Sequence, residues 1–268
     1  MYQGTIVPMI TPLSRDGSVS EDGVRRLVES VRPHVTALMP VLSSGEAWQL
    51  SAAQWRDMVM YTQRHAGGLP VLAGVLLPDT VRVVARARLA EELGVDAVVA
   101  TTPFRPDIGQ DEIFRHYQAI RAAVDVPLFL YNEKAVSGNQ IEIGTLARIC
   151  ALPNVVGIKE SSGSAEFTRA LVARLAVDGR PVPVFEGWEN LLYDAGGVSG
   201  FIGPLANLDP VLCNAMLREP TPERQAGVNA AAERYGLFRD DWYRWIKREL
   251  VARGVIDTDT TADTEVLL

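Results

Sequence analysis

The sequence predicts an α/β protein, a (β/α)8 TIM barrel with additional C-terminal helices. Short apolar runs alternate with amphipathic segments along most of the 268 residues. Eight such runs occur, rich in Val, Ile and Leu and largely apolar on both faces, as strands of a buried parallel sheet must be. A barrel of this kind takes ~250 residues as a single domain, which matches the length.

Each predicted strand is an apolar run, and most are followed by a segment with helical signals. The strands are Thr5–Ile10, Ala37–Leu42, Val71–Val75, Ala97–Thr101, Leu128–Tyr131, Val155–Lys159, Val182–Phe185 and Gly200–Gly203. Helical spacing marks Glu21–Val31, Thr80–Leu93 and Asp111–Val124, and Ser51 begins a further helix. The alternative fold, a doubly wound open sheet, lacks its common nucleotide-binding signatures GxGxxG and GxxxxGK(S/T).

Three more helices follow the eighth strand, at Pro210–Arg218, Pro222–Phe238 and Trp242–Arg253. We therefore expect the barrel over residues 1–205 and a helical extension of the same domain over 206–256. The residues from 257 to 268 are acidic and rich in threonine, which predicts a flexible tail.

Charge and composition exclude several classes of function. A formal net charge of −7 and a pI near 5.1 argue against a broad basic surface for nucleic acid or anionic lipid. Cys150 and Cys213 form no disulfide framework, and neither they nor the three histidines have metal-ligand spacing. Because no signal peptide and no apolar run of ~18 residues occur, we expect a soluble cytoplasmic protein without a membrane span. No metal, nucleotide or flavin is implied by the sequence.

Polar residues follow several predicted strands, and in a barrel these strand ends form the active site. The candidate strand ends are Ser43-Ser44-Gly45-Glu46, Tyr131-Asn132, Lys159-Glu160-Ser161-Ser162 and Glu186-Gly187-Trp188-Glu189-Asn190.

Lys159 is the sharpest candidate for chemistry. Only three of the 26 basic residues are lysines, and this one ends a strand that carries no other charge. If the side chain lies inside the barrel, desolvation lowers the pKa of its amine. A neutral amine can form a Schiff base with a ketone, which arginine cannot do. The alternative is a lysine that points to solvent or pairs with Glu160.

Tyr131, Ser43 and Ser44 are the other candidates. A phenol at the end of the neighbouring strand could transfer protons to and from an adduct of the amine. Two hydroxyl groups with nearby backbone N–H groups suit a small carboxylate. The alternatives are a core tyrosine with a satisfied hydroxyl group and a helix-capping turn.

Seven motifs occur in register between Gly4 and about Gly254. They are Gly4-Thr-Ile-Val-Pro-Met-Ile-Thr11-Pro12, Ser43-Ser44-Gly45-Glu46, Gly74 followed by Ala90-Glu-Glu-Leu-Gly94, Thr102-Pro103-Phe104, Tyr131-Asn132, Gly157-Ile-Lys159-Glu160-Ser161-Ser162-Gly163 and Gly203-Pro-Leu-Ala206-Asn207. Together they resemble the class I pyruvate-dependent aldolases of the dihydrodipicolinate synthase and N-acetylneuraminate lyase family.

The resemblance implies a role for each matching position. Lys159 would form the Schiff base, Tyr131 would transfer protons, Ser43 and Ser44 would hold the carboxylate of a 2-oxo acid, and Gly187 and Ile202 would border the pocket. We expect Ser161, Glu189 and Asn190 to contact the substrate as well.

Departures from the family pattern predict that this is not a typical dihydrodipicolinate synthase. Val136 stands where the synthase has an arginine for its second substrate, and Arg105 stands where it has a relay tyrosine. The positions that the sialate lyase uses for sugar hydroxyls are altered too, at Glu189 and Asn190. Because Arg105 and Lys134 add positive charge near the mouth of the site, an anionic acceptor is a hypothesis.

The leading interpretation is a Schiff-base lyase or aldolase that makes or breaks a C–C bond of a 2-oxo acid, with pyruvate as donor or product and an aldehyde as acceptor. The same imine chemistry would serve a dehydratase of a 2-oxo-3-deoxy acid. A non-catalytic barrel that binds 2-oxo acids and a phosphate-ester enzyme are the remaining alternatives. The resemblance also implies a homo-oligomer, a dimer or a tetramer.

Overall fold

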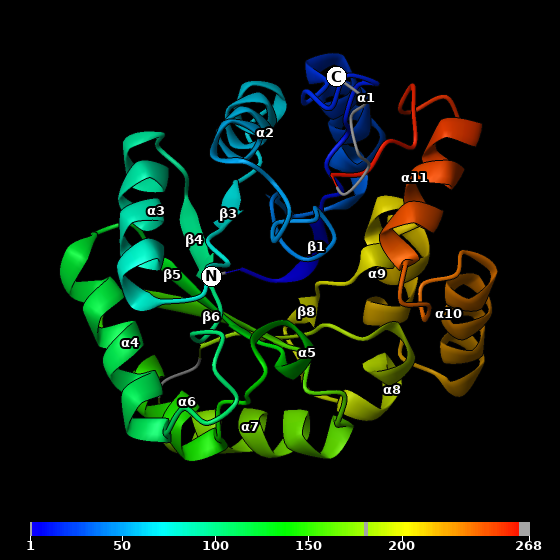
Figure 1. Cartoon of the computed structure of the whole chain (residues 1–268). Coiled ribbons are helices and arrows are strands. Elements are labelled where there is room, and N and C mark those ends of the chain that lie inside the picture. Colours follow the sequence, from blue (N-terminus) through cyan, green and yellow to red (C-terminus); the bar gives the residue numbers. More distant parts are fainter. Residues whose placement is uncertain (1, 180–181, 263–268) are drawn as a thin grey trace. The chain divides into compact units, whose positions relative to one another are not determined.

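The computed structural model describes residues 2–179 and 182–262. The chain divides into two compact units. The first comprises residues 1–4 and 72–201, and the second comprises residues 5–71 and 202–268. Each unit is described by itself below, with element labels as in Figure 1.

Six parallel strands form the sheet of the first unit, and each pairs with the next along the chain. They are β3 (Leu72–Gly74), β4 (Ala97–Ala100), β5 (Leu128–Asn132), β6 (Val155–Glu160), β7 (Val184–Glu186) and β8 (Gly200–Phe201). The connecting helices are α3 (Thr80–Glu92), α4 (Gln110–Ala123), α5 (Lys134–Ser137), α6 (Ile143–Cys150), α7 (Ala165–Val177), the 3-10 turn η2 (Glu189–Leu191) and α8 (Leu192–Ala195). Helices α3, α4 and α7 lie around the outside of these strands, with α3 and α4 at the left and α7 below (Figure 1).

Local sequence explains why these elements begin where they do. The Asp79 side chain accepts from the Arg82 N–H at the start of α3, and Ser164 accepts from the Phe167 N–H at the start of α7. Gly157 in β6 leaves the space that the Phe129 ring fills, because a Cβ atom there would lie 2.1 Å from a ring carbon. Close packing between β5 and β6 therefore depends on that glycine.

The second unit holds the parallel pair β1 (Gly4–Pro8) and β2 (Ala37–Met39). Its helical elements are α1 (Glu21–Val31), η1 (Arg32–His34), α2 (Ala52–His65), η3 (Pro204–Asn207), α9 (Pro210–Arg218), α10 (Pro222–Arg234) and α11 (Trp242–Ala252). The Asn207 side chain joins the two stretches of sequence that make up this unit, residues 5–71 and 202–268. The Asn207 amide donates to the Pro8 carbonyl at 2.9 Å, and the Asn207 oxygen accepts from the Ile10 N–H at 3.1 Å.

The parallel strands alternate with helices in the order and direction of a (β/α)8 barrel followed by helices, which confirms the predicted fold class. All eight predicted strands are present, most of them shorter than expected, and Glu21–Val31 and Pro210–Arg218 are helices with the predicted bounds. The helix predicted to reach Phe238 ends at Arg234, just before Gly236 adopts a φ of 66°.

The compact units do not follow the predicted bounds of 1–205 and 206–256, so that domain division stays a prediction. Of the segment expected to be a flexible tail, residues 257–262 are described, and Thr261 is buried there. Residues 263–268 lie outside the described part of the chain.

Candidate active site

Strand register in the first unit places the predicted catalytic pair side by side. Tyr131 in β5 is level with Lys159 in β6, and the next residues along, Asn132 and Glu160, are level with each other. Successive residues of a strand point to opposite faces of a sheet. Lys159 and Tyr131 therefore share one face, and Asn132 and Glu160 share the other.

The Lys159 side chain is buried, with 3% of its surface exposed. Its Nζ atom lies 4.2 Å from the centroid of the Tyr131 ring. Burial lowers the pKa of the amine to about 8, and the negative charges of Glu133 and Glu189 oppose that shift. At pH 7 about a tenth of such an amine is neutral and able to attack a carbonyl. The alternative of a solvent-exposed lysine is wrong.

Glu133 is a residue of this site that sequence reasoning missed. It caps the short helix α5, where its Oε1 accepts from the Ala135 N–H at 3.1 Å. Burial raises the pKa of its carboxyl group to about 7, against the lowering effects of that N–H and of Lys159. Because Glu133 directly follows the strand end Tyr131-Asn132, its position in the sequence could have marked it as a candidate site residue.

Glu160 anchors the opposite face of the same strands. Its Oε2 accepts from the Asn132 amide at 2.7 Å, and its Oε1 accepts from the Ser162 N–H at 2.6 Å. The Asn132 oxygen in turn accepts from the Ile141 N–H at 2.9 Å. Burial raises the pKa of the Glu160 carboxyl group. Glu160 thus holds the backbone that carries Lys159 and does not share its face, which argues against a Lys159–Glu160 pair.

Glu186 likewise holds the backbone at the end of β7. Its Oε1 accepts from the Gly187 and Trp188 N–H groups, both at 3.0 Å, and its Oε2 accepts from the Thr168 hydroxyl group at 3.0 Å. Burial raises its pKa to about 7. Three hydrogen bonds to the Glu186 carboxylate therefore fix the turn that leads to Glu189.

The turn after β7 packs closely on the end of β6. The Trp188 indole N–H donates to the Ser161 carbonyl at 3.0 Å. A Cβ atom at Gly187 would lie 1.9 Å from the Ser161 Oγ, so the two strand ends can approach only with glycine there. Glu189 is buried, and its charge acts on Lys159, whereas Asn190 is exposed.

The two cations predicted at the mouth of the site are solvated. The half-exposed Arg105 side chain lies 2.6 Å from Glu112 and 3.6 Å from Asp107. Lys134, the first residue of α5, is exposed. Arg105 is therefore already paired with carboxylates of its own unit.

The remaining predicted residues belong to the second unit. Ser43 and Ser44 are 9% and 1% exposed, and Ile202 is fully buried. The serines lie in a tight turn in which the Gly45 N–H donates to the Leu42 carbonyl at 3.0 Å. Their contact with a substrate carboxylate stays a prediction.

The described residues show neither a group of three His, Cys, Asp or Glu side chains placed to hold a metal ion nor a helix long and apolar enough to cross a membrane.

Comparisons with known proteins point to one family. The model of the dihydrodipicolinate synthetase family matches residues 1–252. A 4-hydroxy-tetrahydrodipicolinate synthase from Gluconacetobacter diazotrophicus is 31% identical over 244 residues, 90% of this chain and 82% of that protein. The synthase of the same name from Thermomicrobium roseum is 34% identical over 222 residues, 81% of this chain and 72% of that protein.

Solved structures of dihydrodipicolinate synthases are similar to nearly the whole of this chain. The dihydrodipicolinate synthase from Acinetobacter baumannii, described as chloride inhibited and complexed with pyruvate, matches with a TM-score of 0.88 and 28% identity, covering 100% of this chain and 94% of that one. The synthase from Bacteroides thetaiotaomicron also gives a TM-score of 0.88, with 26% identity over 98% of this chain and 92% of that one.

A buried lysine that lies against a tyrosine at adjacent strand ends is the arrangement expected of one class of protein, the lyases that work through a lysine amine. Within that class, the chain belongs to the dihydrodipicolinate synthetase family. It is a lyase of the Schiff-base, pyruvate-dependent kind. Its curated relatives are named as synthases, which conflicts with the expectation of an untypical member, although their identity to this chain is only about 30%.

Proposed function

We propose that this protein is an aldolase that joins pyruvate to an aldehyde, or releases pyruvate by the reverse reaction. The observation that carries the proposal is the buried Lys159 amine, which lies 4.2 Å from the Tyr131 ring and has a pKa lowered to about 8 by burial. The Acinetobacter synthase of similar structure is described as complexed with pyruvate, which supports pyruvate as the donor.

The proposed reaction starts when the neutral Lys159 amine attacks C2 of the 2-oxo acid. A C–N bond forms, the former carbonyl oxygen leaves as water, and the imine nitrogen takes up one proton from the solvent or from Tyr131, so that a protonated imine remains. The imine accepts the electron pair released when a C3 proton is removed or the C3–C4 bond breaks, which gives an enamine. Tyr131 is the proposed proton carrier because its ring lies against the amine, and Ser43 and Ser44 are proposed to hold the substrate carboxylate.

The acceptor is proposed to lack a carboxylate of its own. The anionic acceptor inferred from Arg105 and Lys134 loses support because Arg105 is paired with Glu112 and Lys134 is exposed. The charges that act on Lys159 come instead from Glu133 and Glu189, and they would repel a second carboxylate. Val136, at the position of the synthase's arginine, agrees with this proposal.

Reductive trapping tests the proposed chemistry. Incubation with pyruvate and borohydride should leave a reduced adduct on the peptide that contains Lys159, read by intact and peptide mass. Lys159→Arg should abolish the adduct, and Lys134→Arg, a matched change at an exposed lysine, should leave it intact. Absence of any adduct from folded protein, with pyruvate and with other 2-oxo acids, would overturn the aldolase and favour a non-catalytic barrel.

Product analysis then separates the aldolase from the dehydratase. Release of pyruvate from a 2-oxo-3-deoxy acid means C–C cleavage, whereas loss of water without pyruvate means dehydration. We also propose a homo-oligomer, a dimer or a tetramer, which sedimentation velocity would test. The cytoplasmic location stays a prediction from the sequence.

A further inference from the structure

A buried ion pair joins the turn that carries Ser43 and Ser44 to the C-terminal part of the second unit. Lys247 in α11 lies with its Nζ 2.5 Å from the Glu46 Oε1, and both side chains are 0% exposed. Isolated charges are costly to bury, so each of these groups depends on the other.

The chain after α11 completes this pair. The Lys247 amine also donates to the Thr260 carbonyl at 2.7 Å, and the second Glu46 oxygen accepts from the Ala262 N–H at 2.6 Å. We call Glu46, Lys247, Thr260 and Ala262 the C-terminal clamp. It joins the turn at Glu46 to two neighbouring segments near the C-terminal end of the described chain.

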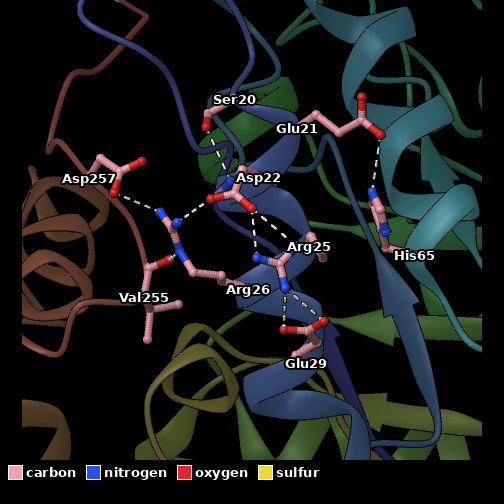
Figure 2. A network of polar contacts seen from close by, with 10 residues as sticks. Ser20, Glu21, Asp22, Arg25, Arg26, Glu29, His65, Val255 and Asp257 are labelled. Carbon is pink, nitrogen blue, oxygen red and sulfur yellow. Dashed lines mark hydrogen bonds and ion pairs between the residues drawn. The ribbon is translucent and has the colours of Figure 1, made fainter.

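The segment that supplies Thr260 and Ala262 is fixed at its beginning as well. Figure 2 shows Arg26 of α1 between Asp22 and Asp257, with its guanidinium group 2.7 Å from the Asp257 carboxylate. The Arg26 Nε donates to the Val255 carbonyl at 2.9 Å. Residues 257–262 are thus attached at one end to α1 and at the other to Glu46.

The turn held by the clamp is conformationally demanding. Val41 and Glu46, on either side of the two serines, have φ values of 57° and 59°, in the left-handed region that non-glycine residues rarely adopt. The Glu46 N–H donates to the Ser43 carbonyl at 3.0 Å, so the position of Glu46 is transmitted directly to the first serine. Such a conformation persists only where its surroundings enforce it.

We propose that the C-terminal clamp is a positioning device for substrate binding, which keeps the Ser43–Ser44 turn in the conformation that accepts the carboxylate of the 2-oxo acid. This inference rests on the proposed function of those serines. Neither Glu46 nor Lys247 touches the substrate in this proposal, because both act through the turn. The C-terminal segment would therefore govern affinity for the 2-oxo acid without taking part in the chemistry at Lys159.

Two truncated proteins provide a matched test. A chain that ends at Thr258 loses the Thr260 carbonyl and the Ala262 N–H, whereas a chain that ends at Ala262 keeps the whole clamp. The probe is pyruvate, and the readout is the pyruvate concentration that half-saturates borohydride trapping at Lys159. We expect that concentration to rise at least tenfold for the chain ending at Thr258, with the same adduct yield at saturation, and to stay unchanged for the chain ending at Ala262.

Two substitutions separate positioning from simple stability. Lys247→Met leaves the Glu46 carboxylate buried without its cation, so both thermal stability and pyruvate affinity should fall. Adding Glu46→Gln removes the uncompensated charge and should recover the unfolding temperature, but not the affinity, because the amine links to Glu46 and Thr260 are still absent. Recovery of both together would mean that stability alone was measured, and would overturn the proposal.

The outcomes distinguish the two proposals. If the full chain forms the Lys159 adduct and every folded clamp variant shows an unchanged half-saturating concentration, the clamp is only structural and the aldolase proposal stands. If the full chain forms no adduct with any 2-oxo acid, both proposals are overturned.

Discussion

Replacement of Glu133 by glutamine should lower the pKa of Lys159 and move the reactivity of the amine toward acidic pH. Glu133 is the first of the two carboxylates whose charge keeps the Lys159 pKa as high as about 8 despite burial. Because the pKa of Glu133 is itself about 7, about half of its charge is present at neutral pH. An opposite charge at close range shifts a pKa by roughly 1–3 units, so a half-charged carboxylate accounts for about one unit.

The expected change follows from these values. With a pKa of about 8, about a tenth of the Lys159 amine is neutral at pH 7; with a pKa of about 7, about half is neutral. The rate of imine formation at pH 7 should therefore rise about fivefold in Glu133→Gln, since only the neutral amine attacks the carbonyl.

The assay is the initial rate of adduct formation with subsaturating pyruvate and cyanoborohydride between pH 6 and pH 9, quantified by intact mass. The midpoint of the rate profile should fall from about 8 to about 7. Glu142→Gln, at an exposed carboxylate in the same unit, should leave the midpoint in place. A midpoint that is unchanged or higher in Glu133→Gln would refute the electrostatic reasoning.

Three further predictions concern the surroundings of the site. Burial raises the Glu186 pKa from 4.5 to about 7, so protonation of this carboxyl group stabilises the fold by about 3 kcal/mol below pH 4.5. This contribution is lost as the pH rises through 7. In urea titrations the free energy of unfolding of Glu186→Gln should therefore fall less than that of the parent between pH 4.5 and pH 7. Gly187→Ala should cost about 1–3 kcal/mol of unfolding free energy in the same assay because its methyl group collides with the Ser161 hydroxyl, and an unchanged value would contradict the close approach. Arg105→Ala should change the half-saturating pyruvate concentration less than about twofold, because the exposed guanidinium group is held by Glu112 and such surface pairs are worth little; a larger loss would restore Arg105 as a substrate contact.

The strands and the buried lysine at the end of β6 were predictable because they depend on local sequence. A strand buried on both faces must be apolar at nearly every position, and this pattern survives in every one of the eight runs. Lys159 is conspicuous against that background because it is the one charged residue of the predicted run Val155–Lys159, and a charge there requires either solvent or a special environment. Its neighbour Tyr131 followed from strand order alone.

The charges around the lysine could not be predicted in the same way. Glu133 acts on Lys159 because the chain turns into α5 directly after β5. Arg105 is paired with a carboxylate because α4 brings Glu112 within 2.6 Å of its guanidinium group. The C-terminal clamp is harder still, since Lys247 follows an ordinary helical pattern and its partner lies in a turn near the other end of the sequence. Pairings of this kind are fixed by tertiary packing, for which a single sequence carries no local signal.

In the proposed reaction, the burial of Lys159 and the acids around it have opposite effects that are both required. Burial alone would favour the neutral amine, which attacks the carbonyl, but the imine that follows must be protonated to accept electrons. Glu133 and Glu189 oppose the effect of burial on the amine, and the same charges stabilise the cationic imine after it forms. Glu160 and Glu186 have a different role, because their carboxylates accept hydrogen bonds from backbone N–H groups at the strand ends and so hold the backbone in place. Alternation along β6 thus places Lys159 on one face of the sheet and Glu160, which holds the backbone, on the other. Changes to Glu160 should therefore displace the lysine, whereas changes to Glu133 should alter its pKa.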